Sequence, residues 1–168
     1  MQARNQLVKN QLDKEVLITH TFNAPRDVVF NAWTNVEQLQ RWYAPKNCTV
    51  QFKEADIRKG GSFLCCIFNP DFGDCWCKAE FIELDFPKLI VYNLANTDKY
   101  GNLINPVDEG FDEEWPGQTV VTITFTEHEG KTTITLHQTV SESLAKRSGA
   151  HPSWIQMLEN LERFTNTI

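Results

Sequence analysis

Four of the five cysteines lie close together, at Cys65, Cys66, Cys75 and Cys77. Thiolates are nucleophiles and ligands for soft metals. If residues 69–74 form a hairpin turn, Cys66 and Cys77 lie nearly opposite each other, Cys75 shares the face of Cys77, and Cys65 points away. A structural zinc site needs four convergent ligands, and this arrangement does not supply them. We therefore predict buried thiols with no metal and no cofactor, and a Cys66–Cys77 disulfide only under oxidising conditions.

Aromatic side chains form a second group with a bearing on function. The sequence holds eleven Phe, five Trp and three Tyr, more rings than a minimal core of this length needs. The rings either line an apolar cavity that holds a flat or hydrophobic molecule, or they fill the core. The predicted ligand-binding residues are Trp33, Trp42, Phe63, Trp76, Phe81, Tyr92, Trp115, Gln138, Trp154, Met157, Leu158 and Leu161.

Groups suited to acid–base chemistry are few. Adjacent strand residues face opposite sides, so either His137 or Gln138 reaches an inner pocket, and the sequence leaves the choice open. Glu80 and Glu83 would act as an acid or base only if buried, and strand glutamates are mostly solvated. No Ser-His-Asp order, zinc-protease helix or phosphate-binding loop is present. We predict no catalytic residue and favour binding over catalysis.

Residue patterns predict the elements that would position these side chains. β-Branched and aromatic residues over Glu15–Phe22 predict a strand. Helical spacing after Pro25 predicts one helix, and Asn35 can cap a second that ends before Pro45. Six further strands are predicted over residues 48–57, 62–68, 75–84, 89–94, 119–125 and 132–140. Their short connections favour antiparallel pairing.

The C-terminal segment predicts a long helix. From Pro152, apolar residues recur on one face, namely Trp154, Met157, Leu158, Leu161 and Phe164. The acidic segment 98–118 predicts a solvated loop, with a lid or a partner surface as alternatives. The element order predicts an α+β domain over residues 16–168, after a polar leader at 1–15, with a curved antiparallel sheet around the last helix.

Bulk composition excludes several classes of protein. A net charge of −6 without a basic cluster argues against nucleic-acid binding. No segment resembles a signal peptide or approaches the roughly 20 apolar residues of a membrane span. We expect a cytoplasmic protein with no membrane partner, either a monomer or a homodimer.

Several motifs occur in a characteristic order: residues 22–34 with Ala24-Pro25, Gly60-Gly61-Ser62-Phe63, residues 80–90, Trp115-Pro116, residues 121–125, and Trp154 with Leu158 and Leu161. This order resembles the activator of 90-kDa heat-shock protein ATPase-like family, within the START-related, SRPBCC or Bet v 1-like helix-grip superfamily. The resemblance implies a helix-grip fold. It also implies three alternatives: a carrier of a small hydrophobic molecule, an interaction module for a 90-kDa chaperone in the stress response, or a cyclase-like enzyme.

Overall fold

The computed structural model describes residues 14–168, so nearly all of the predicted leader at 1–15 lies outside the described residues. Strand β1 (Glu15–Phe22) has the predicted bounds, and buried and exposed side chains alternate along most of it. This alternation directs every second residue to the core.

Two short helices follow β1 as predicted. Helix α2 (Arg26–Thr34) begins after Pro25, whose extended backbone suits a helix entry. Helix α3 (Val36–Leu39) is capped by Asn35, whose side chain accepts a hydrogen bond from Gln38 N. It is shorter than expected, because the chain passes into turns well before Pro45.

The remaining strands form one sheet with β1. They are β2 (Thr49–Asp56), β3 (Ser62–Asn69), β4 (Gly73–Asp85), β5 (Leu89–Thr97), β6 (Gln118–His128) and β7 (Lys131–Ser141). The order across the sheet is β1-β7-β6-β5-β4-β3-β2, and every neighbouring pair is antiparallel. The predicted α+β architecture is confirmed. Strand β5 runs past its predicted end at Leu94, which adds Asn96 to the sheet.

Helix α4 (Glu142–Ser148) was not predicted from the sequence. Ser141 caps it by accepting a hydrogen bond from Leu144 N at 3.2 Å. Only Leu144 and Ala145 are buried, so the helix has too short an apolar stripe to stand out in the sequence. Gly149 separates it from α5 with a φ of 92°, a left-handed conformation that glycine adopts readily.

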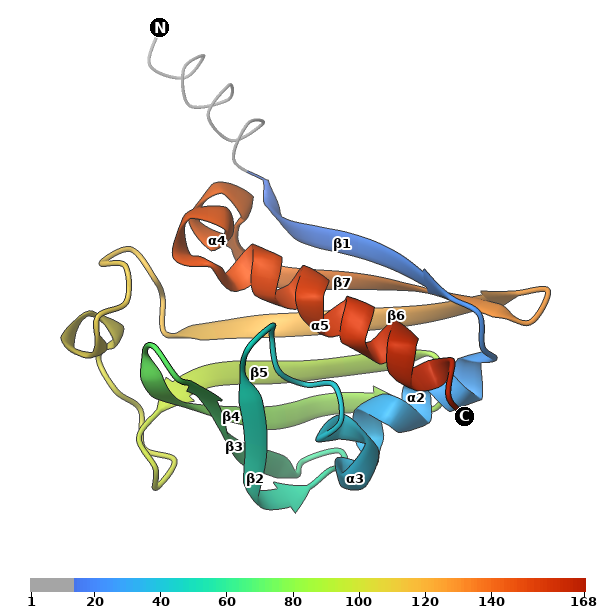
Figure 1. The fold of residues 1–168 in the computed structure, drawn as a ribbon, viewed down its shortest axis with the longest axis horizontal. Coiled ribbons are helices and arrows are strands. Elements are labelled where there is room, and N and C mark those ends of the chain that lie inside the picture. The colour runs from blue at the N-terminus through green and yellow to red at the C-terminus, as the bar shows by residue number, and fades with distance from the viewer. Residues whose placement is uncertain (1–13) are drawn as a thin grey trace, which may run out of the picture.

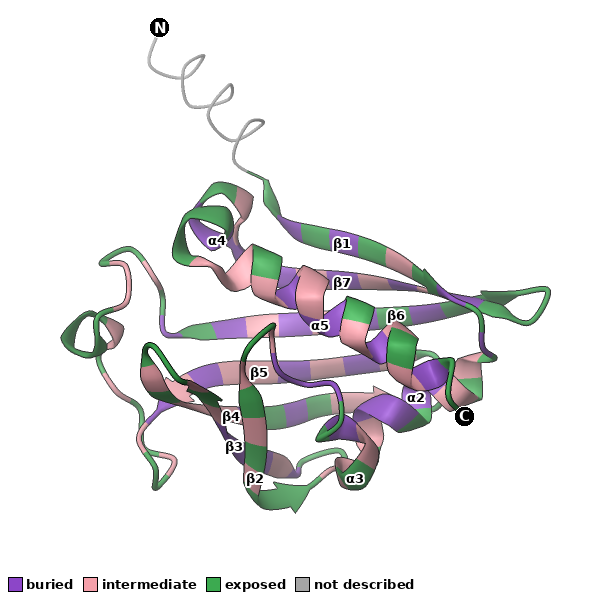
Figure 2. Ribbon diagram, in the orientation of Figure 1, coloured by how far each residue is buried: buried purple, intermediate pink, exposed green. Residues whose placement is uncertain are grey.

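Helix α5 (Ala150–Thr165) begins slightly before the predicted Pro152 and lies across the curved sheet (Figure 1). Its apolar stripe faces the sheet, and the exposed residues lie on the outer side (Figure 2). The connection from β5 to β6 is largely irregular apart from the 3₁₀ turn η1 (Pro106–Glu109). Within residues 14–168, no helix is long and apolar enough to cross a membrane.

Candidate functional site

A cavity of about 180 Å³ lies between the first turns of α5, the sheet and the loop that carries Trp115. Its walls come from α5, the segment after α3, strands β3 to β7 and the β5–β6 connection. The lining residues are Tyr43, Ile67, Cys75, Cys77, Leu94, Asn96, Trp115, Gly117, Thr119, Gln138, Ala150, Ser153, Trp154 and Met157. None of them is an Asp, Glu, Lys, Arg or His. The wall is therefore mostly apolar, with a few neutral polar groups.

Gln138 is fixed in orientation by two buried hydrogen bonds. Trp154 Nε1 can only donate, so the atom that it contacts at 2.9 Å is the carbonyl oxygen Oε1 of Gln138. The amide nitrogen Nε2 then donates to Thr119 Oγ1 at 3.0 Å. Because Thr119 accepts this bond, its hydroxyl proton is free to serve as a donor at the cavity wall.

Asn96 is fixed in the same way on β5. Trp115 Nε1 can only donate, and it lies 2.9 Å from Asn96, so the contacted atom is the carbonyl oxygen Oδ1. The amide nitrogen Nδ2 therefore points away from Trp115 Nε1. Among the described residues, Asn96 Nδ2 has no hydrogen-bond acceptor. Asn96 and Thr119 both line the cavity, so Asn96 Nδ2 and the Thr119 hydroxyl are the neutral donors available at its wall.

A wider groove of about 750 Å³ borders this cavity. The two share seven lining residues: Ile67, Cys75, Asn96, Trp115, Ala150, Ser153 and Met157. Unlike the cavity, the groove has charged residues on its wall, at Asp74, Asp98, Lys99 and Glu109. Phe72, at the tip of the β3–β4 hairpin, is 90% exposed at its rim. A molecule that reaches the cavity from this side therefore crosses a partly charged outer groove.

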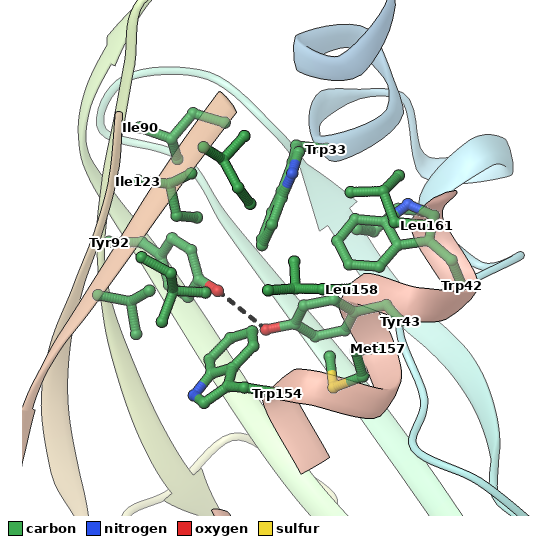
Figure 3. Close-up of a cluster of buried hydrophobic side chains, with 14 of the residues drawn as sticks. Trp33, Trp42, Tyr43, Ile90, Tyr92, Ile123, Trp154, Met157, Leu158 and Leu161 are labelled. Atoms are coloured by element: carbon green, nitrogen blue, oxygen red, sulfur yellow. Dashed lines mark hydrogen bonds between the residues drawn. The ribbon is translucent and has the colours of Figure 1, made fainter. Parts of the chain in front are cut away.

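Most of the predicted aromatic residues lie in the packed core instead. Trp33 and Trp42 meet edge to face at 4.5 Å between ring centroids, and Phe63 and Phe81 lie 5.9 Å apart. Tyr92 Oη lies 3.0 Å from Tyr43 Oη in a buried hydrogen bond (Figure 3). Leu158 and Leu161 pack in the same cluster. Burial raises the pKa of both tyrosines well above the ordinary value, so both stay neutral.

The structure thus divides the predicted ligand-binding residues into three groups. Trp115, Gln138, Trp154 and Met157 line the cavity. Trp76 lines only the outer groove, where Lys53 Nζ lies 5.9 Å from its ring centroid. The others line neither space: Trp33, Trp42, Phe63, Phe81, Tyr92, Leu158 and Leu161. Trp42 donates through Nε1 to Ala32 O inside the core.

Sequence reasoning missed several lining residues. Thr119 shares a strand face with Val121 inside a predicted strand, so period-2 counting would have found it. Asn96 shares a face with Tyr92 and Leu94, but it lies beyond the predicted end of its strand. Cys75 and Cys77, predicted to be buried thiols, are only half-buried and line the cavity.

The predicted hairpin register was wrong by one residue. Cys65 pairs with Cys77, while Cys66 pairs with Trp76. The turn over residues 69–73 is closed by the pair of Asn69 with Gly73. This pair sets the register of all other residue pairs between β3 and β4. Cys66 and Cys77 are therefore on opposite faces, and the predicted Cys66–Cys77 link is excluded in this register.

Cys75 and Cys77 form a close thiol pair, with Sγ atoms 4.0 Å apart. A hydrogen bond from Cys77 lowers the pKa of Cys75, and burial opposes this effect only in part. The same interaction and burial raise the pKa of Cys77 well above its ordinary value. Burial likewise raises the pKa of Cys65. Cys75 is thus the thiol of this group that ionises first.

The remaining candidates for acid–base chemistry point away from the cavity. His137 faces outward and contacts Glu15 at 3.0 Å, whereas Gln138 is 2% exposed and points inward. Glu80 pairs with Lys78, and Glu83 pairs with Lys59, on the outer surface. Across the described part of the chain, no three His, Cys, Asp or Glu side chains converge as metal ligands.

A family model described as "Activator of Hsp90 ATPase homolog 1-like protein" matches residues 23–166. The chain belongs to this family. A search of curated proteins gives no match. The assignment to the Hsp90 ATPase activator-like family confirms the resemblance in the sequence motifs.

Solved structures of bacterial proteins support the fold of this family member. A Staphylococcus epidermidis protein solved by NMR is 28% identical over 92% of this chain and 91% of its own, with a TM-score of 0.75. An Arthrobacter aurescens protein is 18% identical over 90% and 86%, with a TM-score of 0.77. A Chromobacterium violaceum protein is 17% identical over 89% and 96%, with a TM-score of 0.71. The last two similarities concern the fold alone.

Proposed function

We propose that the protein binds a small, neutral, largely apolar molecule in the cavity beside Trp154, without catalysing a reaction on it. The observation that carries this proposal is the cavity itself, apolar over most of its wall and bordered by residues from α5 and the sheet. Ligand pockets typically combine such a wall with a few placed polar groups.

The wall chemistry restricts the charge of the ligand. Among residues 14–168, no charged side chain lines the cavity, so a buried anion or cation would lose its hydration without gaining a partner. The fixed donors at Asn96 and Thr119 suit an acceptor oxygen, as in a ketone, an ester or an ether. A neutral ring or chain with one such oxygen satisfies both features.

The cavity volume restricts the size of the ligand. An engineered apolar cavity of about 150 Å³ holds benzene. The cavity here, at about 180 Å³, therefore suits a single ring with a short substituent. A longer ligand would extend between Trp115 and Met157, which line both spaces, into the outer groove.

Native mass spectrometry of the protein purified from its own host tests this proposal. The expected result is a bound neutral molecule that denaturation releases and that mass analysis identifies. A protein free of ligand that also fails to change its tryptophan fluorescence with any member of a library of neutral aromatic ketones, ethers and esters would contradict it.

The family description supports a second candidate, an interaction module for a 90-kDa heat-shock chaperone. Its surface would be the acidic β5–β6 connection, where Asp108, Glu109 and Glu113 are exposed. The test is co-purification with the host chaperone and its ATPase rate, with and without the protein. No binding and no change in rate would remove this candidate.

The cyclase-like alternative has less support. Acid–base catalysis needs a titratable group at the reacting atoms, and the described residues place only the Tyr43 phenol and the two thiols at the cavity wall. Tyr43 stays neutral because burial raises its pKa. The thiols remain, and they suggest a different chemistry.

A further inference from the structure

We propose that Cys75 captures neutral α,β-unsaturated carbonyl compounds covalently from within the cavity. The inference rests on the proposed function, because the electrophile must first enter the same cavity. It names the class of ligand: an apolar enone, enal or quinone-like molecule whose carbonyl oxygen meets the neutral donors on the wall.

Cys75 is the thiol best placed for such a reaction. It lines both the cavity and the outer groove, whereas Cys77 lines only the cavity and Cys65 is fully buried. Cys75 is therefore one of the residues that a ligand meets as it passes from the groove to the cavity. Cys48 lines only the groove and serves as an internal comparison.

The Cys75 and Cys77 thiols are held together without being placed to form a disulfide. Residues two apart on a strand are separated by about 6.6 Å. A disulfide needs its Cβ atoms about 3.5–4.5 Å apart, so closing one here would require the strand to bend. The sulfurs instead lie 4.0 Å apart, where either thiol can donate. When Cys75 is ionised, Cys77 is the one of the two that still has a proton to donate.

This contact favours the reactive form of Cys75. The thiolate is the nucleophile, and the hydrogen bond from Cys77 lowers the pKa of Cys75. Cys77 keeps its own proton, since burial and the same hydrogen bond raise its pKa. The pair thus has one nucleophile and one donor that stabilises it.

Asn96 supplies the second part of the site. It pairs with Cys77 across β4 and β5, so its side chain is on the same face as both thiols. The bond from Trp115 fixes Oδ1 and leaves Nδ2 as the donor. Nδ2 therefore suits the carbonyl oxygen of the electrophile, where negative charge develops during addition.

The chemical step is a conjugate addition. The Cys75 thiol releases its proton to water, and the thiolate sulfur forms a bond to the β-carbon as the carbon–carbon π bond breaks. The electron pair moves to the carbonyl oxygen, which accepts a hydrogen bond from Asn96. The α-carbon then takes a proton from water, and the product is a neutral thioether ketone with nothing oxidised or reduced.

Intact mass spectrometry with benzylideneacetone, a neutral aromatic enone, tests the inference on the full chain. The expected result is one adduct, mapped by peptide analysis to Cys75, absent in Cys75→Ser and unchanged in Cys48→Ser. Ala150→Leu, which fills the shared wall, should slow the reaction about tenfold, because a thiol reacts faster with a positioned electrophile. Glu159→Leu, on the exposed side of the same helix, should leave the rate unchanged.

Benzylacetone, the saturated analogue, separates this inference from the proposed function. It should bind reversibly, change tryptophan fluorescence and slow the labelling of Cys75. If benzylacetone binds and benzylideneacetone forms no adduct, the inference is wrong and the proposed function stands. The inference is also wrong if Cys75 is labelled at the same rate in Ala150→Leu as in the wild type, or if adducts form at Cys48 as fast as at Cys75. Either result would mean that the exposure of the thiol, and not the cavity, determines the reaction. If neither compound binds or reacts, both fail for this class of ligand.

Discussion

Trp154 Nε1 donates a 2.9 Å hydrogen bond to Gln138 Oε1 and so joins the start of α5 to β7 at the wall of the cavity. The Gln138 amide nitrogen Nε2 in turn donates to Thr119 Oγ1 at 3.0 Å. Three elements of the fold thus meet at one polar contact in an otherwise apolar wall. The contact both holds the helix on the sheet and sets which donors a ligand meets.

Replacing Gln138 with Leu should destabilise the protein. The change leaves Trp154 Nε1 buried without an acceptor, which costs about 1–3 kcal/mol in the free energy of unfolding. Urea denaturation measures the loss. His137→Leu, at the neighbouring outward-facing position, is the matched control and should change stability by about 0.5 kcal/mol or less. Equal effects of the two variants would contradict a structural role for this hydrogen bond.

The buried tyrosine pair predicts a loss of stability at alkaline pH. Tyr43 and Tyr92 keep their protons in the fold, because burial raises the pKa of each above 10.0, the value for an exposed phenol. Above about pH 10 the unfolded chain releases protons that the folded chain retains, so the free energy of unfolding falls by about 1.4 kcal/mol per pH unit for each tyrosine.

Denaturation between about pH 9 and pH 11 tests this sign. The double variant Tyr43→Phe/Tyr92→Phe should show a shallower decline than the wild type, because the thiols of Cys65 and Cys77, whose pKa values are also raised, contribute to both proteins. At neutral pH, the single Tyr43→Phe change should lower the free energy of unfolding by more than half of the loss in the double variant. The single change leaves the buried hydroxyl of Tyr92 without its hydrogen-bond partner. Identical pH slopes for wild type and double variant would show that the pair does not titrate as described.

Arg147 should control the order of the loop that carries Trp115. Its guanidinium contacts Asp112 at 2.8 Å and Glu114 at 3.2 Å, and these contacts link the β5–β6 connection to α4. Arg147→Ala should increase amide hydrogen exchange over residues 112–117, while overall stability changes by less than about 1 kcal/mol, because the pairs are exposed.

Lys146→Ala is the control for this loop prediction. Lys146 is the adjacent residue on α4 and pairs with Glu142 of the same helix, so its removal should leave the loop unchanged. Equal exchange in the two variants would mean that other contacts, such as the Trp115–Asn96 hydrogen bond, hold the loop without Arg147.

The strands and the last helix could be predicted from the sequence because apolar residues repeat within each of them at the spacing typical of that element. Alternation along β1 and the stripe on α5 depend on local spacing, which the sequence displays directly. Helix α4 escaped prediction because only Leu144 and Ala145 mark its buried side. The hairpin register failed by one residue because it depends on which pair closes the turn, Asn69 with Gly73.

The cavity wall was harder to predict than the fold. Counting aromatic residues cannot separate rings that border a space from rings that fill one, since both are buried and apolar. Trp154 borders the cavity, whereas Trp33 lies in the core, with 6.5 Å between the centroids of the two rings. Both are tryptophans on the apolar side of a helix, so the sequence does not distinguish them. The polar residue Asn96 lies beyond the predicted end of its strand, and strand ends are the least certain part of a prediction from sequence.

A fluorescence titration with a matched pair of ligands tests whether the cavity holds a neutral guest. Benzylacetone is neutral and carries an acceptor oxygen, and phenylbutyrate has a similar shape with a negative charge. We expect benzylacetone to bind at least about tenfold more tightly, because no cationic side chain among residues 14–168 lines the cavity to pair with a carboxylate. Ala150→Leu should remove this binding, whereas Glu159→Leu should retain it. Equal affinity for both ligands, or equal binding by the Ala150→Leu variant, would contradict a neutral guest in this cavity.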